Sequence, residues 1–293
     1  MSTVLLFGGS GFIGRQVRAL LAEEDGITLD CPGRDRFDLL GRDPGELRAL
    51  LAEVRPDVVV NCTGRLDGTG HELVLANTAV TAVLVDAMAA VTPGARLVRL
   101  GSAAEYGVVP HGTAVPETYP ALPVSEYGVS HLAGTGLVDV AAAAGRLDGV
   151  VLRLFNPIGP GLHEANMLGR AVALLRQALD RRADSITLGP LGAYRDFVDV
   201  RDVADAVRRV VLAGDLPERV YNVGSGTAVP ARTAVRLLAE VAGFTGEIVE
   251  HGAGPVRSST VGWACADVSR AKEILDWAPL YPLADSIKAI WTG

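Results

Sequence analysis

The sequence predicts an α/β fold in which helices cover both faces of a parallel β-sheet, with a smaller α/β lobe near the C-terminus. Three observations support this prediction. Short β-branched runs alternate with longer helical patterns up to about residue 156, and right-handed crossovers of this kind make the strands parallel. A glycine-rich turn joins the first strand to the first helix. The length of 293 residues suits one large domain that carries an added lobe.

The elements follow from the apolar patterns in chain order. In the first half, strands are expected at 3–7, 27–31, 57–62, 96–101 and 150–155, and helices at 12–22, 46–54, 72–90 and 127–144. The alternation stops at two Gly/Pro-rich segments, 157–161 and 189–193. Beyond them we expect strands at 197–200 and 219–223 and helices at 203–213, 230–242 and 269–275. We therefore assign 1–156 and 194–223 to the large domain, and 157–193 and 224–293 to the lobe, where the three tryptophans are expected to pack.

Composition excludes several classes of protein. Lys and Arg number 27 against 34 Asp and Glu, a net charge of −7, which argues against binding to nucleic acid or to a membrane surface. The three scattered cysteines have no paired spacing, so no zinc site or disulfide framework is expected, and the histidines show no metal-ligand spacing. The N-terminus has no signal-peptide pattern, and no apolar run reaches the roughly 18 residues of a membrane span. We expect a cytoplasmic protein without a metal.

Glycines 8, 11 and 14 lie between the first strand and the first helix. The first glycine allows a tight turn, the second lets the backbone approach a pyrophosphate, and the third lets helix and strand pack closely. The helix N-terminus then offers free N–H groups and partial positive charge to phosphate. This placement predicts a Rossmann-type, dinucleotide-binding domain rather than a merely glycine-rich turn.

The loop after the second strand bears on the choice of nicotinamide cofactor. An acidic residue at the strand tip accepts a hydrogen bond from the ribose 2′-OH of NAD, whereas an arginine there suits the 2′-phosphate of NADP. Asp30 is expected within the strand, Arg34 where a 2′-phosphate would lie, and Asp38 near the adenine amino group. We favour NADP(H), with NAD(H) as the alternative if the loop arginines are merely solvated. The expected cofactor contacts are Gly8, Ser10, Gly11, Phe12, Ile13, Gly14, Arg34, Asp38, Leu39, Cys62, Thr63, Gly64, Asn77, Tyr127 and His131.

Three side chains can converge beside the nicotinamide. Ser102 ends a central strand, while Tyr127 and His131, four residues apart, share one face of the helix that follows. The combination brings together a hydroxyl, a phenol and an imidazole.

With these features the chain resembles the extended short-chain dehydrogenase/reductase family, in particular its nucleotide-sugar enzymes. The resemblance covers nearly the whole chain. Its markers are the glycine loop, Asn61, Asn77, Ser102 before Tyr106-Gly107, Tyr127, Arg153 to Gly159, Arg195 to Asp199, Asp202, Tyr221 to Gly224, Arg257, and Asp267 to Pro279. It implies that Tyr127 donates or accepts a proton, that Ser102 hydrogen-bonds the substrate oxygen, and that hydride moves between the nicotinamide and a sugar carbon.

His131 is the main departure from the family pattern, which has a lysine that grips the nicotinamide ribose and lowers the pKa of the tyrosine. A histidine titrates near 6.5, so it is mostly uncharged at neutral pH. Reduction uses the protonated tyrosine and should suffer less than oxidation, which needs the phenolate. His131 therefore favours a reductase, and the alternative is an inactive relative that only binds NADP(H) or a nucleotide sugar.

The residues after Ser102 argue against a dehydratase. Relatives that dehydrate the sugar have acidic residues there, whereas this chain has Ala103 and Ala104, and Glu105 is expected to point elsewhere. Asn156, Arg195 and Arg257 match family positions that bind the diphosphate, and an arginine fork suits phosphate oxygens. For Arg195 the alternative is a salt bridge with Asp196 or Asp199, and for Arg257 a solvated loop.

These observations together predict an NADP(H)-dependent reductase for the C4 ketone of a nucleotide-activated 4-keto-6-deoxy sugar, with dTDP as the expected carrier. The rival enzyme is a nucleotide-sugar C4 epimerase that keeps NAD bound. The resemblance further implies a homodimer formed through helices 72–90 and 127–144.

Overall fold

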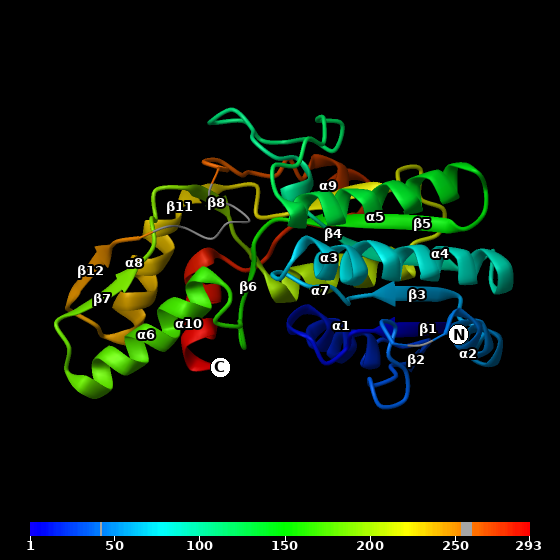
Figure 1. Cartoon of the computed structure of the whole chain (residues 1–293), viewed down its shortest axis with the longest axis horizontal. Helices are drawn as coiled ribbons and strands as arrows, with labels where there is room; N and C mark the ends of the chain where they lie inside the picture. The colour runs from blue at the N-terminus through cyan, green and yellow to red at the C-terminus, as the bar shows by residue number, and fades with distance from the viewer. Residues whose placement is uncertain (42, 253–259) are drawn as a thin grey trace.

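The computed structural model describes residues 1–41, 43–252 and 260–293. Its centre is a six-stranded sheet in the order β10-β5-β4-β3-β1-β2, and every pairing in it is parallel (Figure 1). The strands of this sheet are β1 (Ser2–Phe7), β2 (Ile27–Asp30), β3 (Val58–Asn61), β4 (Arg96–Ser102), β5 (Asp148–Leu154) and β10 (Val220–Val223). The predicted α/β class with a Rossmann-type parallel sheet is thereby confirmed.

Helices bury apolar side chains against both faces of the sheet. Alternate strand residues such as Leu5 and Leu6 enter opposite cores, as the two-residue period of a strand requires. The first core is covered by α1 (Phe12–Ala22), α7 (Val200–Leu212) and α9 (Ser269–Leu275). The second is covered by α2 (Pro44–Val54), α4 (Val80–Val91) and α5 (Glu126–Ala143). Trp277, expected in the smaller lobe, lies instead in the first core, where its indole N–H donates to the Asp202 carbonyl at 3.0 Å.

The smaller lobe has its own core and stands beyond one end of the sheet (Figure 1). It packs the helices α6 (Met167–Arg181), α8 (Ala231–Ala242) and α10 (Leu283–Thr292). Three two-stranded sheets connect its segments: β6 (Pro157–Ile158) with β9 (Val198–Asp199), β7 (Ser185–Leu188) with β12 (Glu247–Glu250), and β8 (Tyr194–Asp196) with β11 (Ala228–Pro230). The sequence patterns missed α6 and α10.

One continuous helical stretch, Gly70–Val91, is long and apolar enough to cross a membrane by length and composition. It comprises α3 (Gly70–Leu73), the π-helical η1 (Val74–Ala79) and α4. The α4 part is a core helix, because Leu84, Val85 and Met88 are fully or almost fully buried against the sheet.

Candidate active site

The glycine turn has the geometry that a pyrophosphate site needs. Gly8 has φ +79°, a conformation that favours glycine. A Cβ at Gly14 would overlap the carbonyl oxygen of Gly8, so only glycine lets α1 begin this close to the turn. Among the described residues no side chain caps the N-terminus of α1, which leaves its first N–H groups available to an anion. The residues present fit a bound dinucleotide.

The tip of β2 differs from the expectation. Asp30 is the last residue of the strand rather than an internal one, and the Arg36 guanidinium binds its carboxylate through two bonds of 2.6 and 3.0 Å. Arg34, which we expected at a 2′-phosphate, is exposed on the loop beyond. Asp38 accepts a hydrogen bond from the Leu40 N–H at 3.1 Å. At the tip of β2, the Asp30 carboxylate is therefore paired with Arg36, and Arg34 is a second arginine nearby in the sequence.

The loop after β3 is held in place by two asparagines. Asn61 Oδ1 accepts from the backbone N–H and the hydroxyl of Thr63, at 3.0 and 2.6 Å. The Asn77 side chain binds both backbone groups of Arg65, at 2.8 and 3.0 Å, and donates to Ser130 Oγ at 3.0 Å. Asn77 thus fastens this loop to α5, so that Cys62, Thr63 and Gly64 keep their place beside the glycine turn.

Ser102 and Tyr127 are brought together by a close approach of backbones. Ser102 ends β4, and its Oγ accepts from the Ala104 N–H at 3.2 Å. A Cβ at Gly128 would lie 2.5 Å from the Ala104 carbonyl oxygen, so the missing side chain lets the first turn of α5 rest on the turn after Ser102. Tyr127 is half-buried in that first turn. The phenol and the hydroxyl therefore belong to two backbone segments in direct contact.

His131 packs against Tyr127, with ring centroids 4.5 Å apart and planes tilted by 56°. The imidazole is 8% exposed, and burial together with the nearby Arg99 charge lowers the pKa of His131 to about 3. Its Nδ1 has no hydrogen-bond partner among the described residues. A neutral imidazole, as expected from the sequence, therefore lies beneath the phenol.

Glu105 is turned into the protein interior, and the turn that contains it is the reason. It ends the 3₁₀ turn η2 (Ala103–Glu105). Its fully buried carboxylate accepts from the Ser102 N–H and from Arg153 Nε, each at 2.9 Å. Ala103 and Ala104 leave the substrate side of the turn without an acid.

The expected substrate residues Asn156 and Arg195 lie close together. Asn156 has φ +32°, and its side-chain amide donates to the Asp196 carbonyl at 2.9 Å. Arg195 is half-buried, burial lowers its pKa, and its Nη1 donates to the Tyr194 carbonyl at 2.8 Å. Arg257 lies outside the described residues.

The acids next to Arg195 are bound elsewhere. Asp196 accepts from the N–H groups of Ser225, Gly226 and Ala266, and Asp199 pairs with Arg201 at 2.8 Å. Neither Asp196 nor Asp199 therefore forms the salt bridge with Arg195 that the sequence left open as an alternative.

The sequence patterns did not predict two arginine contacts at the site: Arg36 binds Asp30, and Arg99 donates to the His131 carbonyl. The signal for Arg99 was present, because an arginine with apolar neighbours in the middle of a fully buried strand needs an explanation.

Comparison with known proteins identifies the family of this chain. The model of the NAD dependent epimerase/dehydratase family matches residues 4–224, and the chain belongs to that family. It is 40% identical over 302 residues to the dTDP-6-deoxy-L-talose 4-dehydrogenase (NAD(P)(+)) of Kitasatospora kifunensis, covering 99% of this chain and 95% of the relative. It is similar to the structure of RMD from Pseudomonas aeruginosa complexed with NADPH, with a TM-score of 0.88, 27% identity, and 100% and 98% of the two chains covered.

A further similar structure is the UDP-glucose 4-epimerase of Thermus thermophilus in complex with NAD, with a TM-score of 0.83, 25% identity, and 99% and 98% covered. The fold, the site and these relatives define an NAD(P)-dependent oxidoreductase of the nucleotide-sugar group.

Proposed function

We propose that this enzyme uses NADP(H) to reduce the C4 ketone of a dTDP-linked 4-keto-6-deoxy sugar. The observation that carries the proposal is the contact between the Ser102 turn and the first turn of α5, which pairs a hydroxyl with a half-buried tyrosine and leaves only alanines at 103 and 104. The similarity to a dTDP-6-deoxy-L-talose 4-dehydrogenase supports this substrate class, because a 4-dehydrogenase run in reverse reduces a 4-ketone.

The roles of the side chains follow from their chemistry. When bound, the nicotinamide supplies the hydride to C4. Ser102 donates a hydrogen bond to the substrate oxygen, which stabilises the negative charge that develops there. Tyr127 then gives its phenolic proton to that oxygen as general acid. Neutral His131 holds the nicotinamide ribose by a hydrogen bond, and Asn156 and Arg195 bind the diphosphate.

The direct test is NADPH oxidation by the purified protein across a panel of nucleotide-linked 4-keto sugars, with product stereochemistry read by NMR. We expect turnover with a dTDP-4-keto-6-deoxy sugar and one NADPH consumed per product. The rival C4 epimerase would purify with bound NAD and consume none. Stoichiometric NAD in the purified protein, with interconversion of C4 epimers, would overturn the proposal.

The preference for NADP(H) depends on the arginines beyond β2. Arg34→Ala should weaken NADPH binding about tenfold, the loss of one charge-assisted phosphate contact of roughly 1.4 kcal/mol, and leave NADH nearly unchanged. By contrast, Arg36→Ala should improve NADH binding, because it frees the Asp30 carboxylate to accept a hydrogen bond from the ribose 2′-OH of NADH. Dissociation constants from nucleotide fluorescence check both changes. Equal losses of NADH and NADPH in Arg34→Ala would contradict the preference.

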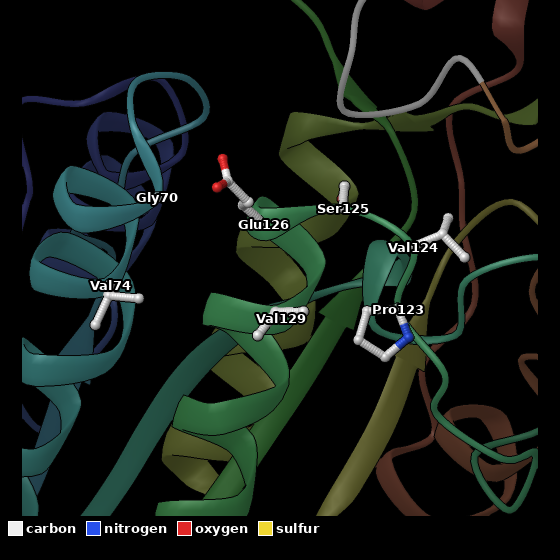
Figure 2. Close-up of a pocket in the computed structure, with 7 residues that line it drawn as sticks. All are labelled: Gly70, Val74, Pro123, Val124, Ser125, Glu126 and Val129. Carbon is white, nitrogen blue, oxygen red and sulfur yellow. The ribbon is translucent and has the colours of Figure 1, made fainter.

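We further propose a homodimer through η1 and α5. Apolar side chains are exposed along this face: Val74, Leu75, Val129, Leu137 and Val140, between 37% and 70%. A hollow of about 390 Å³ lies between the two helices. Figure 2 shows Val74 and Val129 on either side of it, with Glu126 above them. A second copy would remove this apolar face from water.

The dimer makes a prediction about Val140, which is 70% exposed. Val140→Asp places a charge in the proposed interface, and burial of an unpaired charge is costly, so we expect a monomer at micromolar concentration. Light scattering coupled to size exclusion measures the mass. Leu179→Asp, on the exposed side of α6, is the matched control and should leave the mass unchanged. A monomeric parent protein would refute the proposed interface.

A further inference from the structure

Arg99 is a buried cation without an acidic partner. It projects from β4 and is 2% exposed. Its guanidinium donates to four neutral oxygens: Thr81 Oγ1 at 3.1 Å, Thr135 Oγ1 at 3.1 Å, the His131 carbonyl at 3.1 Å and the Asn77 carbonyl at 3.4 Å. Among the described residues none of its hydrogen-bond partners is a carboxylate. The positive charge is therefore solvated by dipoles but not neutralised.

The other arginine of this strand shows the contrast. Arg96 is similarly buried, at 8% exposed, but its Nε binds the Asp148 carboxylate at 2.7 Å. Its remaining N–H groups donate to the carbonyls of Val210, Ala213 and Gly214. Arg96 therefore has an acidic partner, as a buried cation usually does. What requires an explanation is that Arg99, unlike Arg96, has no carboxylate among its hydrogen-bond partners in the described residues.

The neighbouring helices are shaped around the Arg99 guanidinium. A Cβ at Gly134 would lie 2.7 Å from Cζ and 2.8 Å from Nε of Arg99, so α5 has a glycine in its interior where the guanidinium meets its backbone. Glycine there costs about 1 kcal/mol relative to alanine. On the other side, the π-helical turn η1 pairs the Val80 N–H with the Leu75 carbonyl, and the Asn77 carbonyl accepts from Thr81 and Arg99. Where they meet the Arg99 guanidinium, α5 therefore has a destabilising glycine and η1 departs from α-helical hydrogen bonding.

The charge lies at the catalytic face of α5. Arg99 binds the backbone of His131, whose ring packs on Tyr127. Within the described part of the chain, the charged groups that face it are Glu105 and Arg153, which are bound to each other at 2.9 Å. The groups that face it from η1 and α4 are the neutral Asn77 and Thr81. Burial lowers the pKa of Arg99, while the charge of Glu105 and that of a deprotonated Tyr127 oppose this lowering, so Arg99 and a negatively charged Tyr127 stabilise each other. Arg99 is thus a cation, without a carboxylate hydrogen-bond partner among the described residues, that is bound to the helix that carries the phenol, and an arginine stays protonated throughout the working pH range.

We propose that Arg99 is a positioning residue that supplies, from beneath α5, the fixed positive charge that stabilises the tyrosinate form of Tyr127. In this arrangement the charge and the ribose hydrogen bond, which one lysine provides in the family pattern, are divided between Arg99 and neutral His131. The inference rests on the proposed function only in taking Tyr127 as the proton-transferring group.

The first experiment measures the ionisation of Tyr127 without any substrate. Ultraviolet difference titration of the protein against its Tyr127→Phe version gives the midpoint of this one phenol. Arg99→Met should raise the midpoint by about one pH unit, the low end for loss of a nearby opposite charge. Arg99→Lys should stay near the parent value. Arg96→Met is the matched control, since it removes a buried arginine from the same strand, and it should lower stability without moving the midpoint.

The second experiment moves the positive charge from position 99 to position 131. Below the Tyr127 midpoint, Arg99→Met should slow sugar oxidation about tenfold, because a one-unit shift lowers the phenolate fraction tenfold, and should move the alkaline limb of the pH profile upward. The double variant Arg99→Met/His131→Lys should restore both. His131→Lys alone puts two cations side by side and should bring no gain.

Failure of this proposal is separable from failure of the proposed function, because the phenol titration needs no sugar. An Arg99→Met midpoint equal to that of the Arg96→Met control would overturn it. Should Arg99→Met not fold, the Tyr127 midpoint is measured in Gly134→Ala instead. The added methyl group displaces the Arg99 guanidinium from its place against α5, although the arginine stays charged. An unchanged midpoint in that variant also counts against the proposal.

Discussion

Tyr127→Phe should lower kcat for ketone reduction by about a thousandfold, within the range that general acid catalysis contributes. The change removes one oxygen atom and leaves a ring that still packs on His131 at the same place in α5. The Kd for NADPH should stay within about threefold of the parent value, because the glycine turn that we expect to bind the pyrophosphate is untouched. Steady-state NADPH oxidation and nucleotide fluorescence together measure the two effects.

The control for this prediction is Tyr119→Phe. Tyr119 is also half-buried and lies edge-on to Tyr106, with ring centroids 6.4 Å apart. It should retain most of the activity. A Tyr127→Phe enzyme as active as Tyr119→Phe would remove the phenol from the reaction. Cofactor binding without turnover in the parent protein would instead identify a binding protein that has lost catalysis.

Local patterns were sufficient to predict the sheet and the cofactor turn. Strands β1 and β3 contain short continuous apolar runs that are visible in the sequence, and the glycine spacing follows from backbone contacts within a few residues of each other. Ser102 and Tyr127 could be paired from the sequence because a strand end and the following helix start meet at the same edge of a parallel sheet. These features depend mainly on residues close in the chain.

The parts that were missed depend on long-range contacts. Trp277 enters the core of the large domain because its indole reaches the Asp202 carbonyl, 75 residues earlier, and no local pattern near residue 277 indicates that partner. The end of β2 is a local exception, because the strand was predicted to end one residue later, at Cys31 rather than at Asp30. Arg99 has a role that becomes visible only when β4 is assembled with two separate helical segments, since its four acceptors come from Gly70–Val91 and from α5.

Glu105→Ala should lower the free energy of unfolding by about 3–5 kcal/mol, the usual cost of removing one partner from a buried ion pair. The carboxylate is fully buried and bonds both Arg153 Nε and the Ser102 N–H. Its loss leaves the buried Arg153 guanidinium with the Tyr106 ring, 4.7 Å away, and a long bond of 3.5 Å to the Glu117 carbonyl. It also frees the turn that holds Ser102, so activity should fall further than stability alone explains.

Urea denaturation and NADPH oxidation check these two effects, and two further variants separate them. Glu105→Gln keeps the acceptor for the Ser102 N–H and removes only the charge, so it should retain more activity than Glu105→Ala at a similar loss of stability. Glu105→Leu/Arg153→Met replaces the buried pair by apolar side chains and should recover much of the stability, because no unpaired charge remains, while activity stays low. Full activity in this double variant would show that Glu105 does not hold Ser102, and the carboxylate would then serve Arg153 alone.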